Sequence, residues 1–327
     1  MALLTTKTPY AIAIHGGAGS IPESDLRQNK NAYEKILQSV LKTSLELLRI
    51  GRRADEVATR AVALLEDFPH FNAGKGSVLG NDGRVTMDAA IHTHLSENPS
   101  DLTSEHQTIY FGSVIGVSQV KNPVKLAKAI SEHGEHNIIS GHQALDFARE
   151  QLLELVPEDY FVTDYRRSQL ELAKRIGAVC LDHFVEKPEK NEEKFGTVGA
   201  VVVDAHRNLC AATSTGGITN KKYGRVGDAP LPGCGTFAHQ ESAAMSATGR
   251  GEIFTKLTVC SEIHARMKYG GYSLDDAVKT VIHDYLPPNT GGLIAVDPHG
   301  QLSMHFNTEA MFRGAASQTG EFSIGIH

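Results

Sequence analysis

A threonine behind a glycine, at the start of a buried strand, is the position in this sequence best suited to nucleophilic chemistry. Gly196 and Thr197 follow a charged, coil-prone segment, 189–194, and open the β-branched run 197–204. If the backbone is cut between these two residues, Thr197 gains a free α-amine beside its hydroxyl. Such an amine has a pKa of roughly 8 or below, so it can act as the general base for its own side chain. A purely structural threonine is the commoner meaning of this pattern, because β-branched residues favour strands, so other residues have to support the chemical interpretation.

Two other segments bring together groups that suit an amino-acid substrate. Arg225 and Asp228 lie in the glycine- and proline-punctuated loop 220–230. An arginine can hold a carboxylate through two parallel hydrogen bonds, and an aspartate can hold an ammonium group. The glycine-rich turn 248–252 precedes a predicted helix and offers backbone N–H groups to a developing oxyanion. An ordinary surface ion pair and a helix-capping turn are the alternatives, and the residue types alone leave them open.

The loop 67–77 directly follows a predicted helix, 54–66, and is rich in turn residues. A helix C-terminus and loop carbonyls can surround a monovalent cation with backbone oxygens alone. An ordered loop without an ion is an equally open interpretation. His92 and His94 have a spacing that can bind a metal, which makes a metal-dependent amidohydrolase a rival hypothesis, although loop histidines are the plainer account.

The element that must position Thr197 is a predicted β-hairpin. A polar turn at 204–208 separates the first run from a second strand, 209–215, which ends at Gly216 and Gly217. The wider pattern of strands, helices and strands on either side of a linker, 184–196, suits two packed sheets covered by helices. The predicted strands are 10–14, 85–90, 112–117, 292–297 and 301–306, and the predicted helices are 29–50, 54–66, 122–130, 142–155, 168–182, 253–269 and 274–283.

Composition restricts the class of protein. The 327 residues are 41% hydrophobic and 21% charged, with a net charge of -6, which is ordinary for a globular enzyme. The negative charge and the lack of a basic cluster argue against a nucleic-acid or anionic-membrane partner. The sequence shows neither a signal-peptide pattern nor an apolar run of about 18 residues, so a cytoplasmic enzyme is expected. Four scattered cysteines without CxxC spacing favour reduced thiols.

Several ordered motifs together resemble the plant-type L-asparaginases, the isoaspartyl aminopeptidases of the N-terminal-nucleophile (Ntn) hydrolases. The resemblance spans almost the whole chain, and its motifs are 15–19, 71–74, 196–201, 213–217, 224–228, 248–252 and 306–309. It implies an α/β fold, a four-layer αββα sandwich built as one domain, 1–327. It also implies self-cleavage between Gly196 and Thr197 into an α subunit, 1–196, and a β subunit, 197–327, with two αβ units pairing as (αβ)2.

The resemblance assigns a role to each matching residue. Thr197 would be the nucleophile, with Thr215 beside it and Asn72 in contact with it. The Thr248 hydroxyl and the Gly249 N–H would form the oxyanion hole. The substrate-binding groups would be Arg225 for the α-carboxylate and, for the α-amine, Asp228 and the Gly251 carbonyl. The carbonyls that match the family's sodium-binding loop belong to Leu65, Glu66, Phe68, Phe71, Ala73 and Lys75.

The activity implied by the resemblance is hydrolysis of the side-chain amide of L-asparagine and of the β-aspartyl bond of isoaspartyl dipeptides. No cofactor is needed for this chemistry, although a structural Na+ is expected. Some relatives have a potassium-responsive loop, whose place is taken here by 118–122, and whether that segment binds K+ is left open. A glycosylasparaginase-like amidase shares the nucleophile scaffold, but it usually travels the secretory route. The sequence does not settle the preference between the two substrates.

Overall fold

The computed structural model describes residues 9–21, 23–95, 108–177, 179 and 196–327. Of the predicted linker, 184–196, only Gly196 belongs to these residues, and it is buried. The remainder of that linker therefore lies outside the described part of the chain.

The larger of two sheets has Thr197 on a central strand. Its strand order is β12-β11-β1-β5-β6-β2-β3-β4, and neighbouring strands are antiparallel except for the β3–β4 pair. The predicted hairpin is β5 and β6, and every residue of both strands is buried. The strand bounds are β1 Ala11–Gly19, β2 Met87–Leu95, β3 Thr108–Val117, β4 Ile138–Ser140, β5 Thr197–Val203, β6 Leu209–Thr215, β11 Ala310–Ser317 and β12 Phe322–Gly325.

The smaller sheet packs on one face of the larger sheet, and it has the order β10-β9-β8-β7. Small and β-branched side chains fill the space between the sheets, among them Ala11, Val201, Ala244 and Ile294. Because side chains alternate along a strand, Thr197 lies on the same face of β5 as Val201 and points between the sheets. The strand bounds are β7 Thr236–Ala238, β8 Ala244–Gly249, β9 Gly291–Val296 and β10 Leu302–Phe306.

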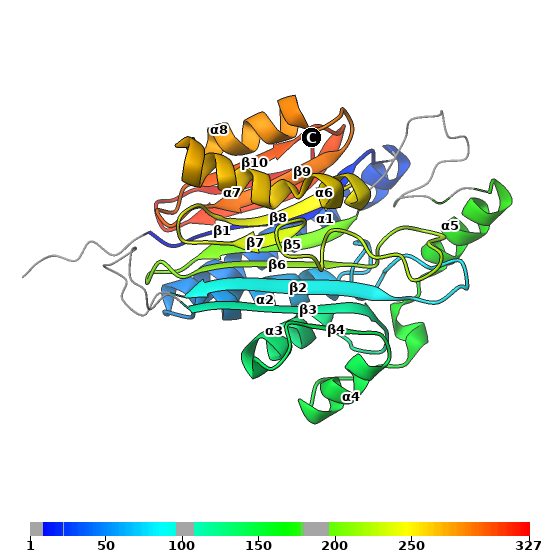
Figure 1. The fold of residues 1–327 in the computed structure, drawn as a ribbon. Helices are drawn as coiled ribbons and strands as arrows, with labels where there is room; N and C mark the ends of the chain where they lie inside the picture. The colour runs from blue at the N-terminus through cyan, green and yellow to red at the C-terminus, as the bar shows by residue number, and fades with distance from the viewer. Residues whose placement is uncertain (1–8, 22, 96–107, 178, 180–195) are drawn as a thin grey trace, which may run out of the picture.

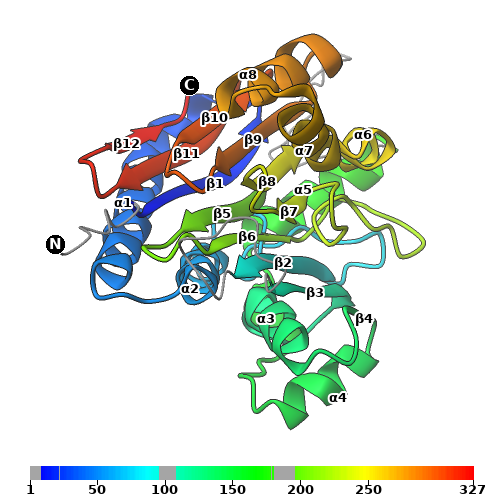
Figure 2. The same ribbon diagram turned by 60° about the vertical axis from the view of Figure 1, so that its left-hand side comes forward.

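Helices cover the two outer faces, which gives the four layers seen in Figure 1 and Figure 2. The outer face of the larger sheet carries α1 Glu23–Arg49, α2 Ala54–Glu66 and α3 Pro123–His133, and the smaller sheet carries α6 Gly251–Leu257, α7 Val259–Gly270 and α8 Leu274–Lys279. The chain between α3 and the hairpin forms α4 Gln143–Glu150, a 3-10 turn at Glu158–Phe161 and α5 Asp164–Arg175. The predicted αββα sandwich is confirmed.

Several predicted element bounds were wrong, and local contacts explain two of them. The helix expected over 253–269 is divided into α6 and α7 at Thr258, whose φ of 45° interrupts the helix. The helix expected from Ser168 begins at Asp164 because the Thr163 side chain accepts a hydrogen bond from Arg166 N and caps the helix. Strands β11 and β12 lacked an alternating pattern strong enough to predict.

The turn between β5 and β6 anchors the hairpin to α2. The Asp204 carboxylate accepts hydrogen bonds from Ala54 N at 3.0 Å, from His206 N at 2.8 Å and from Asn208 N at 3.1 Å. We expect Asp204→Ala to lower the free energy of unfolding by about 2–4 kcal/mol, because a helix cap and buried turn bonds are lost together. Denaturant unfolding checks this value. The control is Asp297→Ala, which removes a similar turn bond without a helix contact, and equal losses in both variants would contradict the account.

Candidate active site

The Thr197 hydroxyl is held at the start of β5 by a neighbour on β6. Thr197 is buried, and its Oγ1 donates a hydrogen bond to Thr215 Oγ1 at 3.2 Å. Thr215 Oγ1 also accepts from Gly217 N at 3.0 Å. The antiparallel register places Thr197 directly opposite Thr215, so the two side chains share one face of the sheet. The predicted nucleophile and its predicted neighbour are therefore in contact.

Thr248 and Gly249 reach the space between the sheets from the end of β8, which packs against β5. Thr248 is fully buried, and its Oγ1 accepts a hydrogen bond from Ala18 N at 3.3 Å. A hydroxyl that accepts in this way keeps its own proton free to donate. Gly249 has a φ of 154°, and a Cβ there would lie 2.3 Å from Thr290 O, so no larger residue fits. The pair can supply a hydroxyl and a backbone N–H to an oxyanion.

Asn72 braces the segment that follows Thr215. Its Nδ2 donates to Gly217 O at 2.8 Å, its Oδ1 accepts from Val78 N at 3.0 Å, and its backbone carbonyl accepts from Gly216 N at 2.9 Å. Gly217 therefore links Asn72 to Thr215, because its carbonyl accepts from Asn72 and its N–H donates to the Thr215 hydroxyl. The bonds of its side-chain amide hold a loop in place, and the predicted contact with Thr197 itself is not among them.

Arg225 and Asp228 lie together around a group of glycines. A Cβ on Gly251 would lie 2.8 Å from Arg225 Nη2 and 2.9 Å from Asp228 Oδ1. A Cβ on Gly217 would lie 3.4 Å from Arg225 Nη1, which connects this pair to Thr215. Asp228 is buried, and its Oδ2 has no hydrogen-bond partner among the described residues. Oδ2 lies beside Gly235, and Oδ1 is the oxygen on the side of Gly251, so a ligand ammonium group there would compensate the buried charge through Oδ1.

One edge of the Arg225 guanidinium is already occupied. Its Nε and Nη2 donate to the two carboxylate oxygens of Glu252, at 2.9 Å and 3.0 Å. This fixes the guanidinium plane and leaves Nη1, on the side of Gly217, as the part of the group directed at a ligand. A cavity of about 440 Å³ opens beside Arg225 and is lined by 80–82, 86 and 221–225.

A buried polar chain joins the two sheets beneath the site. His15 Nε2 lies 2.9 Å from Ser246 Oγ, which lies 2.7 Å from Thr213 Oγ1, and Thr236 Oγ1 donates to Thr213 Oγ1 at 2.6 Å. Burial lowers the pKa of His15 to about 3, so the ring is neutral. These bonds fix the distance between β1, β6 and β8, the strands on which the candidate groups depend.

Comparison with known proteins decides the family. The asparaginase family model matches residues 8–326. An isoaspartyl peptidase of Escherichia coli (strain K12) is 41% identical over 305 residues, which cover 92% of this chain and 91% of the relative. The chain belongs to the asparaginase family. A probable isoaspartyl peptidase/L-asparaginase 2 of Arabidopsis thaliana is 36% identical over 334 residues, 97% of this chain and 98% of the relative. A plant-type L-asparaginase of Pyrococcus furiosus is 36% identical over 309 residues, 92% and 94% respectively.

The resemblance expected from the sequence is thereby confirmed, and the structure of this asparaginase-family chain adds groups that the sequence did not single out. Lys221 is buried beside Gly216, although the sequence presented it as part of a polar loop. Glu252 was visible in the glycine-rich turn, but its pairing with Arg225 joins segments distant in sequence. Asp88 is also buried, on β2, and its place inside the predicted strand 85–90 was the signal that could have marked it.

The histidine pair does not support the metal-dependent rival. His92 packs against the rings of Phe111 and Phe237, and His94 Nδ1 accepts from Gln240 N at 3.0 Å. Across the ranges that the structure describes, no three His, Cys, Asp or Glu side chains are grouped so that they could hold a metal ion. This arrangement assigns the two histidines to packing between β2 and β7.

The loop after α2, in which the sequence predicts a sodium site, is tightly folded. Gly76 has a φ of 93°, and a Cβ there would lie 2.2 Å from Pro69 O and 3.0 Å from Phe71 O. Likewise, a Cβ on Gly74 would lie 2.5 Å from Glu66 O. Neither glycine can therefore carry a side chain, and the sodium site itself stays a prediction. A carbonyl already hydrogen-bonded, such as Glu66 O to Lys75 N at 2.8 Å, retains a second lone pair for an ion.

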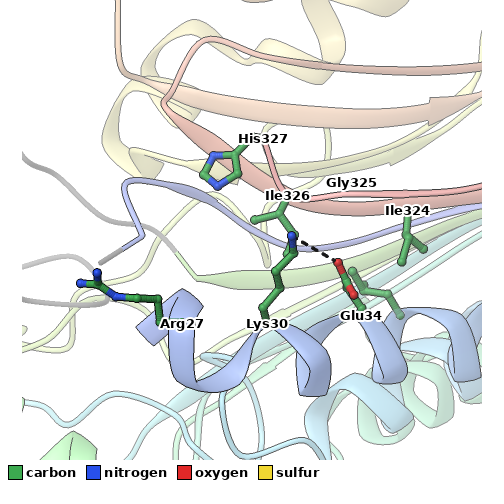
Figure 3. Close-up of a pocket in the computed structure, with 8 residues that line it drawn as sticks. Arg27, Lys30, Glu34, Ile324, Gly325, Ile326 and His327 are labelled. Carbon is green, nitrogen blue, oxygen red and sulfur yellow. Dashed lines mark ion pairs between the residues drawn. The ribbon is translucent and has the colours of Figure 1, made fainter. Parts of the chain in front are cut away.

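A second cavity, of about 420 Å³, lies between α1 and the C-terminal strand and contains none of the predicted site residues. Figure 3 shows its basic side chains, Arg27 and Lys30, with Lys30 Nζ 3.9 Å from a Glu34 oxygen. Its apolar floor comes from Leu37 and the end of β12. The chemistry gathered around Thr197 has no counterpart there.

The charge of Asp228 depends on pH, which makes its predicted role in substrate binding testable. Burial raises the pKa of Asp228 to about 6, and the Arg225 guanidinium opposes that rise. Above this pH the carboxylate can hold an ammonium group, and below it the protonated carboxyl cannot. We expect KM to rise about tenfold for each pH unit below pH 6. Measurement of KM from pH 5 to 8 checks this, with Asp228→Asn as the control, whose KM should be high and independent of pH. A constant KM in the unmodified enzyme would contradict the assignment.

Proposed function

We propose that this chain is an isoaspartyl peptidase and L-asparaginase that uses Thr197 as an N-terminal nucleophile. The observation that carries the proposal is that hydrogen bonds join Thr197, Thr215 and Gly217, and that Arg225 Nη1 lies beside Gly217. It puts a hydroxyl at the first residue of a strand, next to groups that suit an amino-acid head group. The names of the relatives, isoaspartyl peptidase and L-asparaginase, supply the substrate class.

The proposed reaction begins with substrate orientation. Arg225 Nη1 binds the α-carboxylate, while Asp228 and the Gly251 carbonyl bind the α-amine. The side-chain carbonyl carbon then lies next to Thr197 Oγ1, which attacks it as the Thr197 α-amine takes the hydroxyl proton. Donors from Thr248 and Gly249 stabilise the oxyanion, and loss of one such donor costs about 3 kcal/mol of barrier.

The α-amine then returns the proton to the leaving ammonia or amine. A water molecule attacks the aspartyl ester, again with the amine as base, and aspartate is released. Chain opening uses the same hydroxyl, which attacks the carbonyl of Gly196 and moves the acyl group from nitrogen to oxygen before hydrolysis. A glycine at that position leaves its carbonyl accessible.

Three further features belong to the proposal. The loop carbonyls of Leu65, Glu66, Phe68, Phe71, Ala73 and Lys75 would hold Na+, which would fix the loop that carries Asn72. The segment 118–122 is a second candidate for an alkali ion, K+. Two αβ units would pair as (αβ)2. The expected cytoplasmic location stays a prediction, and no helix among the described residues is long and apolar enough to cross a membrane.

Substrate comparison tests the proposal. Purified protein is incubated with L-asparagine, with an isoaspartyl dipeptide and with glycan-linked asparagine, each with and without a chelator of divalent metals. We expect the first two to be hydrolysed, the third to be resistant and the chelator to have no effect. Preference for the glycan-linked substrate would identify a glycosylasparaginase-like amidase instead, and loss of activity with chelator would favour the metal-dependent class.

A further inference from the structure

A buried ammonium group lies close to the candidate nucleophile and has no part in the reaction described above. Lys221 is 8% exposed, and its Nζ donates to Gly216 O at 2.7 Å and to Thr86 O at 2.6 Å. Gly216 directly follows Thr215, which receives the hydrogen bond from the Thr197 hydroxyl. Burial lowers the pKa of Lys221 to about 8, so the ammonium group remains charged at neutral pH.

Asp88 on β2 provides the matching negative charge. It lies opposite Thr215 in the strand register, as Thr215 lies opposite Thr197, so the three side chains share one face of the sheet. Asp88 Oδ1 accepts from Gly116 N at 2.8 Å, and its buried Oδ2 has no hydrogen-bond partner in the described part of the chain. Burial raises the pKa of Asp88, and the Lys221 ammonium opposes that rise, so the two charges are electrostatically coupled.

The other titratable and charged groups around Thr197 and this pair are His15 on β1, Glu66 on α2, Asp82, Arg225, Asp228 and Glu252. Of these, Arg225 acts on both Lys221 and Asp88, and Asp82 acts on Lys221. His15 is neutral for the reason given above, and Glu66 Oε1 accepts a hydrogen bond from Val124 N at 3.0 Å on the helix-covered side of the larger sheet. Arg225 and Glu252 form an ion pair, and a bound amino-acid substrate adds one positive and one negative charge, so Asp228 leaves a net charge of about -1 that is the same in every variant compared. Lys221 and Asp88 are the two charges that the hydrogen bond to Gly216 O and the strand register place next to the Thr197–Thr215 pair.

We propose that Lys221 is a positioning residue for the catalytic base: its ammonium group disfavours a proton on the Thr197 α-amine, and Asp88 moderates that effect. The inference rests on the proposed function, because only chain opening gives Thr197 a free amine. Lys221 Nζ is bonded to Thr86 O, just before β2, and β2 lies two strands from β5, which puts the ammonium group roughly 10 Å from Thr197. At an effective dielectric constant of about 20–40, a charge at that distance lowers an amine pKa by about half a pH unit to one pH unit. The amine is then neutral, and able to accept a proton, over more of the neutral pH range.

The pH dependence of kcat at saturating L-asparagine tests this, because bound substrate removes the contribution of Asp228 to binding. In Lys221→Met the acid limb of the profile should move up by about half a pH unit to one pH unit. Asp88→Asn should move it down, and Lys221→Arg, which keeps the charge, should leave it near its original place. The matched control is Lys222→Met, which removes an exposed charge one residue away and should not move the limb. A structural role for Lys221 would change activity without moving the limb.

The direction of the two shifts separates support from refutation. Opposite shifts in Lys221→Met and Asp88→Asn support the proposal, and an acid limb that coincides with that of the unmodified enzyme in opened Lys221→Met or opened Asp88→Asn overturns it. If both of these variants remain unopened while Lys221→Arg opens normally, the pair acts in chain opening and the proposal is also overturned. If the unmodified protein is never opened, or hydrolyses neither substrate, the proposed function itself is refuted. This result differs from a failure of the Lys221 proposal alone, in which the unmodified enzyme is opened and active.

Discussion

Replacement of Thr197 by alanine is expected to give one intact chain of about 35.3 kDa with no measurable hydrolysis of either substrate. In the proposed reaction, one hydroxyl attacks both the Gly196 carbonyl and the substrate. Its loss therefore removes both chain opening and catalysis, whereas a mere binding residue would affect only the second. Intact mass spectrometry and an ammonia-release assay on the same preparation measure the two effects.

Thr197→Ser is the matched variant for this experiment. A serine keeps the hydroxyl and loses only the methyl group, so we expect two chains and retained, reduced activity. Since β5 is buried over its whole length, a substitution there can disturb folding. Circular dichroism and thermal unfolding of the alanine variant therefore check that its inactivity does not come from misfolding. Two fragments recovered from Thr197→Ala would refute self-cleavage by this residue.

Replacement of Arg225 by alanine is expected to lower kcat/KM by about 30- to 1000-fold, mainly through a higher KM. The removed guanidinium would make charge-assisted hydrogen bonds to the substrate α-carboxylate, which are worth about 2–4 kcal/mol. Michaelis kinetics with an isoaspartyl dipeptide and with L-asparagine measure the change. Both substrates carry the same α-carboxylate, so both should lose a similar factor.

Arg266→Ala is the control for this variant. Arg266 pairs with Glu262 along α7, and this pair is separate from the glycines around Arg225 and Asp228. We expect its kinetics to match those of the unmodified enzyme. If Arg225→Ala has the same kinetics as the control, another residue must bind the substrate α-carboxylate. A large fall in kcat with an unchanged KM would instead place Arg225 in the chemical step.

The sequence predicted the hairpin and the layered architecture because those features depend on local patterns. The run 197–203 is β-branched and apolar, and a polar turn separates it from 209–215, so periodicity and turn chemistry agree. The helix α2 was predicted with its observed bounds, 54–66, for the same reason. The resemblance then placed Thr197, Thr215, Arg225 and Asp228, and the structure brings these residues together along one chain of contacts.

The groups that escaped prediction depend on contacts between distant segments. Glu252 meets Arg225 across 27 positions of sequence, and Lys221 reaches Thr86 across 135. Local pattern cannot reveal that a lysine in a polar loop turns inward, because burial is decided by the strands that close over it. The hydrogen bonds of Asn72 to Gly217 and Val78 likewise became visible only in three dimensions.

The most direct test of the account is the mass and N-terminal sequence of the unmodified, purified protein. We predict two chains, with the smaller beginning Thr197-Val198-Gly199, in a preparation that hydrolyses an isoaspartyl dipeptide. An active preparation that consists of a single uncut chain would contradict the account, because Thr197 would then have no free amine to act as its base.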